Sequence, residues 1–213
     1  MNNDSATTDL LGRLRQGSHE ALAELFSHHR ERLRRIVHFR LDYRLKGRIS
    51  DSDVLQDTYI SAAKRMQHYL DKPEMPFFVW LRLLVNQQLV DVHRQHLQAE
   101  MRDARKEVSL NAGGRSQHTS LAIAAHIAAQ GTSPSKVFEQ AERIAKLEQA
   151  LGDMNEIDRE VIALRHFEEL TSAETAEVLG IEKSAASKRY VRAIKRLQEI
   201  VTAFSSLEKR ELQ

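Results

Sequence analysis

A run of cationic side chains near the C-terminal end carries the most distinctive chemistry in this sequence. Residues 183–196 contain no acid and six basic residues, namely Lys183, Lys188, Arg189, Arg192, Lys195 and Arg196. On a helical wheel most of these cations lie on one side with Ala185, and an apolar set occupies the opposite side: Tyr190, Ile194, Leu197 and Val201. Small residues at the leading end let a helix approach closely, and cations behind them bind phosphate. The pattern therefore favours insertion into a DNA major groove.

A helix-turn-helix is predicted to position this run. Thr171 and Glu174 have the spacing of a capping box, so a helix begins there. Gly180 is placed to end that helix in the left-handed conformation, and Ile181 supplies an apolar contact before the next helix starts at Ser184. A solvated charged helix is the ordinary interpretation of a lone basic run. An acid-free run on the second helix of this motif instead indicates nucleic-acid binding.

The composition of the 213-residue chain is that of an all-α protein. Eight glycines and three prolines are too few for the turns of a β-sandwich or barrel. The absence of cysteine excludes disulfides, thiolate nucleophiles and cysteine zinc sites. No apolar stretch approaches the roughly 20 residues of a membrane span, so we expect no span and a cytoplasmic location.

Opposite charges are segregated along the chain, although 32 basic and 30 acidic residues leave a net charge of only +2. Residues 30–48 hold eight basic side chains, and residues 153–177 hold eight acids, which DNA would repel and which should therefore face away from it. Such blocks indicate a polyanionic partner that is contacted locally.

Hydrophobic periodicity divides the chain into two small helical domains joined by a flexible linker. Residues 1–98 predict a four-helix unit in which one helix is capped by Ser50. Residues 137–213 predict helices near 138–152, 157–169, 172–179 and 184–204. Between them, residues 99–136 lose the periodicity and contain Gly113-Gly114 and Ser133-Pro134-Ser135, so a linker is predicted, with a transient helix over 120–130.

Motifs in both domains resemble bacterial sigma factors of the sigma-70 family. Leu164 to Thr171, Glu174 to Ile181 and Ser187-Lys188-Arg189 resemble region 4. Asp53 to Thr58 resembles region 2.2, and Phe77 to Leu81 with Asp91 to Arg94 resembles regions 2.3 and 2.4. Because the length leaves room only for regions 2 and 4, the resemblance is to the extracytoplasmic-function (ECF) class. Met75 to Phe78 and Ser184 to Tyr190 look like the branch abundant in planctomycete bacteria.

The resemblance implies a promoter-specific initiation factor, without enzymatic activity, cofactor or metal. Its partners would be promoter DNA and core RNA polymerase, through the β′ clamp and the β flap. Polymerase docking would use Asp53, Gln56 and Asp57 in region 2.2. These residues share one helix face and can pair with arginines, although acids also suit any exposed helix N-terminus. An anti-sigma factor is left open as a further partner.

The resemblance also assigns the DNA contacts. The −10 element would be opened and read by Trp80, Asn86 and Arg94, since a flipped base needs aromatic and hydrogen-bonding walls. Trp80 lies in an apolar run, so a core position is an equally good interpretation. The −35 element would be bound by Ala185, Ser187, Lys188, Arg189 and Arg192. Relatives often carry Thr-Val in place of Ala185-Ala186, so their promoter sequences do not transfer.

Two other functions compete with this assignment. A histidine-metal enzyme is conceivable from His28-His29 and from His93 and His96 beside Asp91, but the zincin pattern His-Glu-x-x-His is missing. A stand-alone helix-turn-helix regulator would share the second domain and would typically dimerise on a palindromic site. That alternative leaves the first domain unexplained.

Overall fold

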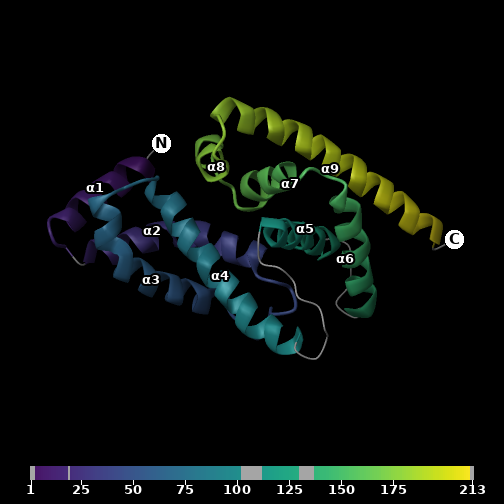
Figure 1. Cartoon of the computed structure of the whole chain (residues 1–213), viewed down its shortest axis with the longest axis horizontal. Coiled ribbons are helices and arrows are strands. Elements are labelled where there is room, and N and C mark those ends of the chain that lie inside the picture. Colours follow the sequence, from purple (N-terminus) through teal and green to yellow (C-terminus); the bar gives the residue numbers. More distant parts are fainter. Residues whose placement is uncertain (1–2, 19, 102–111, 130–136, 212–213) are drawn as a thin grey trace. The chain divides into compact units, whose positions relative to one another are not determined.

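The named secondary-structure elements are all helices in the part of the chain that the structure describes, residues 3–18, 20–101, 112–129 and 137–211 (Figure 1). This computed structural model divides into two compact units. The first combines Met1–His38 with Leu45–Ala104, and the second combines Phe39–Arg44 with Arg105–Gln213. The predicted all-α class with two helical domains is confirmed.

The first unit contains α1 (Asn3–Arg15), α3 (Asp51–Asp71), α4 (Phe77–Met101) and most of α2 (Glu20–Arg40). Its core is aliphatic along α2, where Leu25, Leu33 and Ile36 are fully buried. Helices α3 and α4 lie against each other, and the Gln88 side chain donates a hydrogen bond to the Ser61 hydroxyl at 2.8 Å. This pairing fixes which faces of α3 and α4 remain on the surface.

The start of α3 confirms the cap predicted at Ser50. The Asp53 amide donates to the Ser50 hydroxyl oxygen at 3.2 Å, and the Ser50 amide donates to the Asp53 carboxylate at 3.1 Å. These two bonds supplement the backbone hydrogen bonds at the start of the helix, where the usual carbonyl partners four residues earlier are missing.

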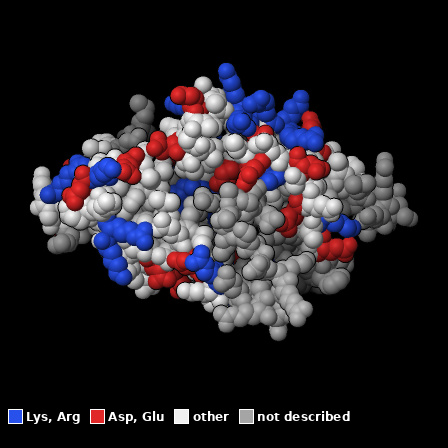
Figure 2. Space-filling model, in the orientation of Figure 1, with Lys and Arg blue, Asp and Glu red and all other residues white. Residues whose placement is uncertain are grey.

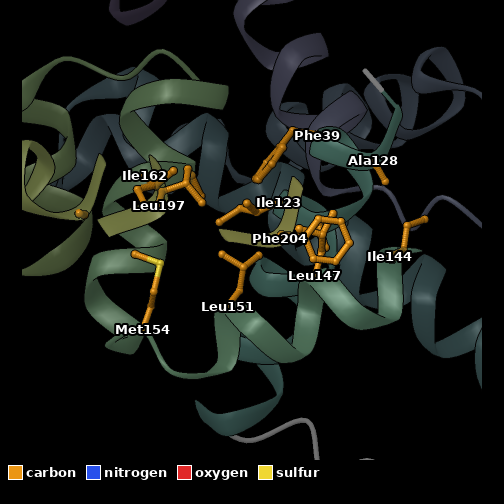
Figure 3. Close-up of a cluster of buried hydrophobic side chains, with 13 residues drawn as sticks. Phe39, Ile123, Ala128, Ile144, Leu147, Leu151, Met154, Ile162, Leu197 and Phe204 are labelled. Atoms are coloured by element: carbon orange, nitrogen blue, oxygen red, sulfur yellow. The ribbon is translucent and has the colours of Figure 1, made fainter. Parts of the chain in front are cut away.

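The second unit contains α5 (Ala112–Ala129), α6 (Val137–Gly152), α7 (Glu156–Ile162), the π-turn η1 (Ala163–Phe167), α8 (Ser172–Leu179) and α9 (Lys183–Glu211). Its core draws apolar side chains from α5, α6, α7 and α9 (Figure 3). Ile123, Leu147, Leu151 and Ile162 are completely buried in it. Phe39 also belongs to this cluster, and its ring stacks on that of Phe167 at 4.5 Å between centroids.

Helix α5 differs from the linker predicted over 99–136. The structure forms a helix over Ala112–Ala129 and buries Ile123, Ala124 and Ala128 completely in the second unit. The small alanines allow α5 and α6 to pack closely, and burying Ile123 provides the energy to order the segment. The sequence signal was misleading because the glycines and polar residues at the start of this helix weaken its period. The neighbouring stretches 102–111 and 130–136 lie outside the described residues.

An ion cluster seats the segment Phe39–Arg44 in the second unit. The Arg40 guanidinium donates to the carboxylates of Glu160 and Glu168, each at 2.6 Å, and the Thr119 hydroxyl donates to Glu160 at 2.8 Å. Burial by itself would lower the pKa of Arg40, but the two carboxylates raise it above its ordinary value. Glu168 is fully buried, so the acidic block is partly structural and does not all face away into solvent.

Candidate nucleic-acid interface

The helix-turn-helix forms as predicted. At its start, the Glu174 amide donates to the Thr171 hydroxyl oxygen at 3.2 Å and the Thr171 amide donates to the Glu174 carboxylate at 2.8 Å. At the end of α8, Gly180 takes the left-handed conformation with φ 63° and ψ 36°. The Ile181 amide then donates to the carbonyl of Ala176 at 3.1 Å. These bonds set the short turn that leads into α9.

Packing decides which side of α9 faces outward. Ala186 and Ala193 are fully buried, and Leu197 is nearly so. The Arg165 guanidinium lies 5.4 Å from the centroid of the Tyr190 ring, which is half-buried. Because the apolar stripe is turned inward, the opposite side of the helix is exposed.

The exposed side of α9 carries long cations. Lys188, Arg192 and Lys195 are all exposed, and Arg196 beside them bonds to Glu199 at 3.2 Å. Figure 2 shows blue side chains gathered at the top of the view, where the first half of α9 runs in Figure 1. We call the exposed residues Ser187, Lys188, Val191, Arg192 and Lys195 the basic face. A face of this composition can bind the phosphates of a duplex.

Arg189 is the exception among the predicted −35 contacts. Its guanidinium donates to the Asp158 carboxylate of α7 at 2.9 Å, and both side chains are about 30% exposed, at 31% and 28%. Ala185 is half-buried, and the exposed Ser187 hydroxyl donates to the Lys183 carbonyl at 3.1 Å. The structure thus brings four of the five predicted residues to or beside the basic face and gives Arg189 a partner within its own unit.

On α3 the predicted polymerase contacts occupy the exposed first turns. Asp53, Gln56 and Asp57 are all exposed, but the Asp53 carboxylate is part of the helix cap. Hydrogen bonds from the Ser50 hydroxyl and amide lower the pKa of Asp53 below its ordinary value. Ile60, about one turn beyond Gln56 and Asp57, adds a 43% exposed apolar side chain to the same helix face, which the charge pattern of the sequence does not indicate.

On α4 the three predicted −10 residues have different environments. Trp80 is 9% exposed, because its ring stacks on Tyr69 at 4.7 Å and lies 5.6 Å from the ring of Phe77. The structure therefore places Trp80 in the core, which is one of the two interpretations that the sequence left open. Asn86 is half-buried and Arg94 is exposed, so these two side chains remain accessible.

The histidine pairs do not gather into a ligand set. His29 is buried, with its ring 5.7 Å from Phe77 and 5.5 Å from Phe78, whereas its neighbour His28 is exposed. Searched over the described residues, His, Asp and Glu side chains form no group of three that could hold a metal ion. Within the same residues no helix has the length and apolar character of a membrane-spanning segment.

Fold and site together define a helical protein whose second unit presents a helix-turn-helix with a cationic second helix, the arrangement of nucleic-acid-binding proteins. A family model described as ECF sigma factor matches residues 4–202. The chain therefore belongs to the ECF sigma factor family, and its predicted function as an RNA polymerase sigma factor is confirmed. Sigma factors are regulatory initiation factors.

The known sigma factor CnrH is similar to this chain in both sequence and fold. The RNA polymerase sigma factor CnrH of Cupriavidus metallidurans is 28% identical over 155 residues, which cover 72% of this chain and 74% of CnrH. A solved structure of CnrH in complex with the cytosolic domain of CnrY shares the fold with a TM-score of 0.51. That alignment has 22% identity and covers 93% of this chain and 98% of the other.

Proposed function

We propose that the second unit binds the −35 promoter element through the basic face of α9. The observation that carries this proposal is the exposure of Lys188, Arg192 and Lys195 on the second helix of a doubly capped helix-turn-helix. Phosphate contacts from these cations supply affinity without sequence preference. Ala185 and Ser187 supply the small leading edge that lets the helix enter the groove.

The first unit docks on core polymerase through the exposed face of α3. Gln56 and Asp57 are adjacent in sequence and expose an amide and a carboxylate, whose oxygens can accept hydrogen bonds from arginines of the β′ clamp. Asp53 contributes its negative charge to the same face while its carboxylate caps the helix. The second unit meets the β flap, as the family resemblance implies.

The −10 element is read by the surface of α4. Asn86 and Arg94, about two helical turns apart, provide a hydrogen-bonding amide and a cation for an unstacked strand. Trp80 acts as a positioning residue: its ring stacks on Tyr69, and the Tyr69 hydroxyl donates to the Met75 carbonyl at 3.0 Å. That bond holds the loop between α3 and α4, which precedes the reading helix.

The bacterial branch of this sigma factor, a further partner and its location are also part of the proposal. The motifs Met75 to Phe78 and Ser184 to Tyr190 favour the planctomycete branch. The solved complex of CnrH with the cytosolic domain of CnrY supports an anti-sigma protein as a further partner. The protein works in the cytoplasm, where its polymerase is, and it contributes recognition to that enzyme without catalysing a reaction itself.

Run-off transcription with purified core polymerase of the source bacterium tests the proposal. We expect core enzyme plus this chain to initiate at discrete promoters, and core enzyme without it to initiate at none. A stand-alone regulator would bind a duplex site without conferring initiation. Specific duplex binding without initiation would therefore contradict the sigma assignment and favour that alternative.

A further inference from the structure

Val191 occupies the centre of the basic face. It is 69% exposed, which makes it the most exposed large apolar side chain among the described residues. Its neighbours one helical turn away are Lys188 on one side and Lys195 on the other, and Arg192 is adjacent in sequence. An apolar side chain is thus surrounded by the cations that are proposed to bind DNA.

Packing and helix propensity do not account for a valine at this position. The core contacts of α9 are made by Ala186, Ala193 and Leu197, which point to the other side of the helix. Valine is a poorer helix former than alanine, lysine or arginine. A single exposed apolar residue is unremarkable on most surfaces, so its position within the basic face is what identifies its role.

We propose that Val191 contacts the C5-methyl group of a thymine in the upstream promoter element. This inference rests on the proposed function of α9. The neighbouring lysines and arginine are long enough to reach phosphates at the groove edges, whereas valine is short and meets what lies directly beneath the helix. In the major groove, thymine is the base that presents a methyl group, and apolar side chains recognise it by contact.

Val191 and the cations then have separate tasks. Lys188, Arg192 and Lys195 hold the helix on any duplex, because phosphates are the same in every sequence. Val191 discriminates thymine from the other bases at one position. The half-buried Ala185 and the exposed Ser187 lie nearer the start of α9 and let it approach closely enough for this short contact.

The test uses the full chain with core polymerase on promoter fragments whose upstream element is randomised. Sequencing of the transcribed fragments identifies positions at which thymine is preferred. At the position read by Val191, replacing thymine by deoxyuridine removes only the methyl group. We expect this to reduce initiation by the parent protein about fourfold, the value of one buried methyl. Alanine can still touch a thymine methyl but is shorter than valine, so we expect Val191→Ala to distinguish thymine from deoxyuridine templates clearly less than the parent does.

Ile157→Ala is the matched control, because Ile157 is a 39% exposed apolar residue of the same unit on α7. It should keep the discrimination of the parent. The inference is overturned if Val191→Ala discriminates thymine from deoxyuridine as fully as the parent does. It is also overturned if the parent shows this discrimination at no thymine of the upstream element. If Val191→Ala binds polymerase or another protein partner more weakly but still discriminates thymine like the parent, Val191 makes a protein contact. That result also overturns the inference. Absence of initiation from every fragment overturns the proposed function as well, so the two failures are distinguishable.

Discussion

The exposed face of α3 that carries Asp53, Gln56 and Asp57 resembles the basic face of α9 in construction. The two faces differ in which charged residues are already bound by other side chains of the protein. Each lies at or just beyond a capping box, formed by Ser50 and Asp53 at α3 and by Thr171 and Glu174 before α9. On each helix one charged residue among the predicted contacts is already held by another side chain. Asp53 is held by Ser50, three residues away, and Arg189 is held by Asp158, 31 residues away.

Asp53 is therefore bound by a residue close to it in the chain, whereas Arg189 is bound by a residue far from it in the chain. The capping role of Asp53 follows from residue spacing along one helix, so the sequence predicts it. The partner of Arg189 depends on how α7 packs against α9, and no spacing rule identifies it. Among the residues predicted as contacts, exposed side chains available to partners therefore include Gln56 and Asp57 on α3, and Lys188 and Arg192 on α9.

Removing two of the three exposed cations of the basic face should have the largest effect. Lys188→Ala with Arg192→Ala deletes two charge-assisted contacts of about 1.5 kcal/mol each, so promoter affinity of the holoenzyme should fall about a hundredfold. The slope of log affinity against log salt concentration should become less negative by about 2, because two phosphate contacts are lost. Fluorescence anisotropy on promoter DNA at several salt concentrations measures both. An unchanged slope would show that neither residue contacts phosphate, and equal polymerase binding by variant and parent is the control.

Reversing the charge at Asp57 should weaken the other interface. Asp57→Lys places a cation where the β′ clamp is proposed to present arginines, so core polymerase affinity should fall roughly tenfold. Affinity capture of core enzyme measures the change. Asp71→Lys reverses an exposed charge at the far end of the same helix and should bind core enzyme like the parent. Equal loss in both variants would assign the effect to overall charge.

Releasing Arg189 tests whether its ion pair competes with DNA. Asp158→Ala removes the carboxylate partner, and a partly exposed ion pair is worth about 0.5 kcal/mol, so promoter affinity should rise about twofold. Glu156→Ala is the matched control, since it removes an exposed first-turn acid of the same helix α7. The same anisotropy assay compares them. A similar increase in both variants would mean that general repulsion by acids, rather than Arg189, limits binding.

The smallest effect concerns the pH dependence of the α3 cap. Hydrogen bonds from Ser50 lower the pKa of Asp53 in the folded protein below the unfolded value of about 3.9. The stabilisation is therefore fully present above that value and is lost as pH falls through the lowered folded pKa. The melting temperature of Asp53→Ala should lie below that of the parent at pH 7 and approach it as the pH falls through the lowered pKa of Asp53. Asp57→Ala, on the same helix without a capping role, should show no such convergence.

Helix caps, helix ends and buried helix faces could be predicted from the sequence where the residues that specify them lie close together in the chain. The caps at Ser50 and Thr171, the left-handed Gly180 and the inward stripe of α9 all follow from spacing within a few residues. Trp80 illustrates the opposite case. Its neighbours in sequence allow either exposure or burial, and only the Tyr69 ring beside it decides for burial.

The sequence by itself determined the helix-turn-helix, the helix caps and the cationic side of α9, because hydrophobic period and capping chemistry act over one or two helical turns. Tertiary structure decided that α5 belongs to the core, that Glu160 and Glu168 bind Arg40, and that Val191 stays exposed among cations. Those outcomes depend on which distant helices meet, and contacts between residues far apart in the chain leave no periodic trace in it.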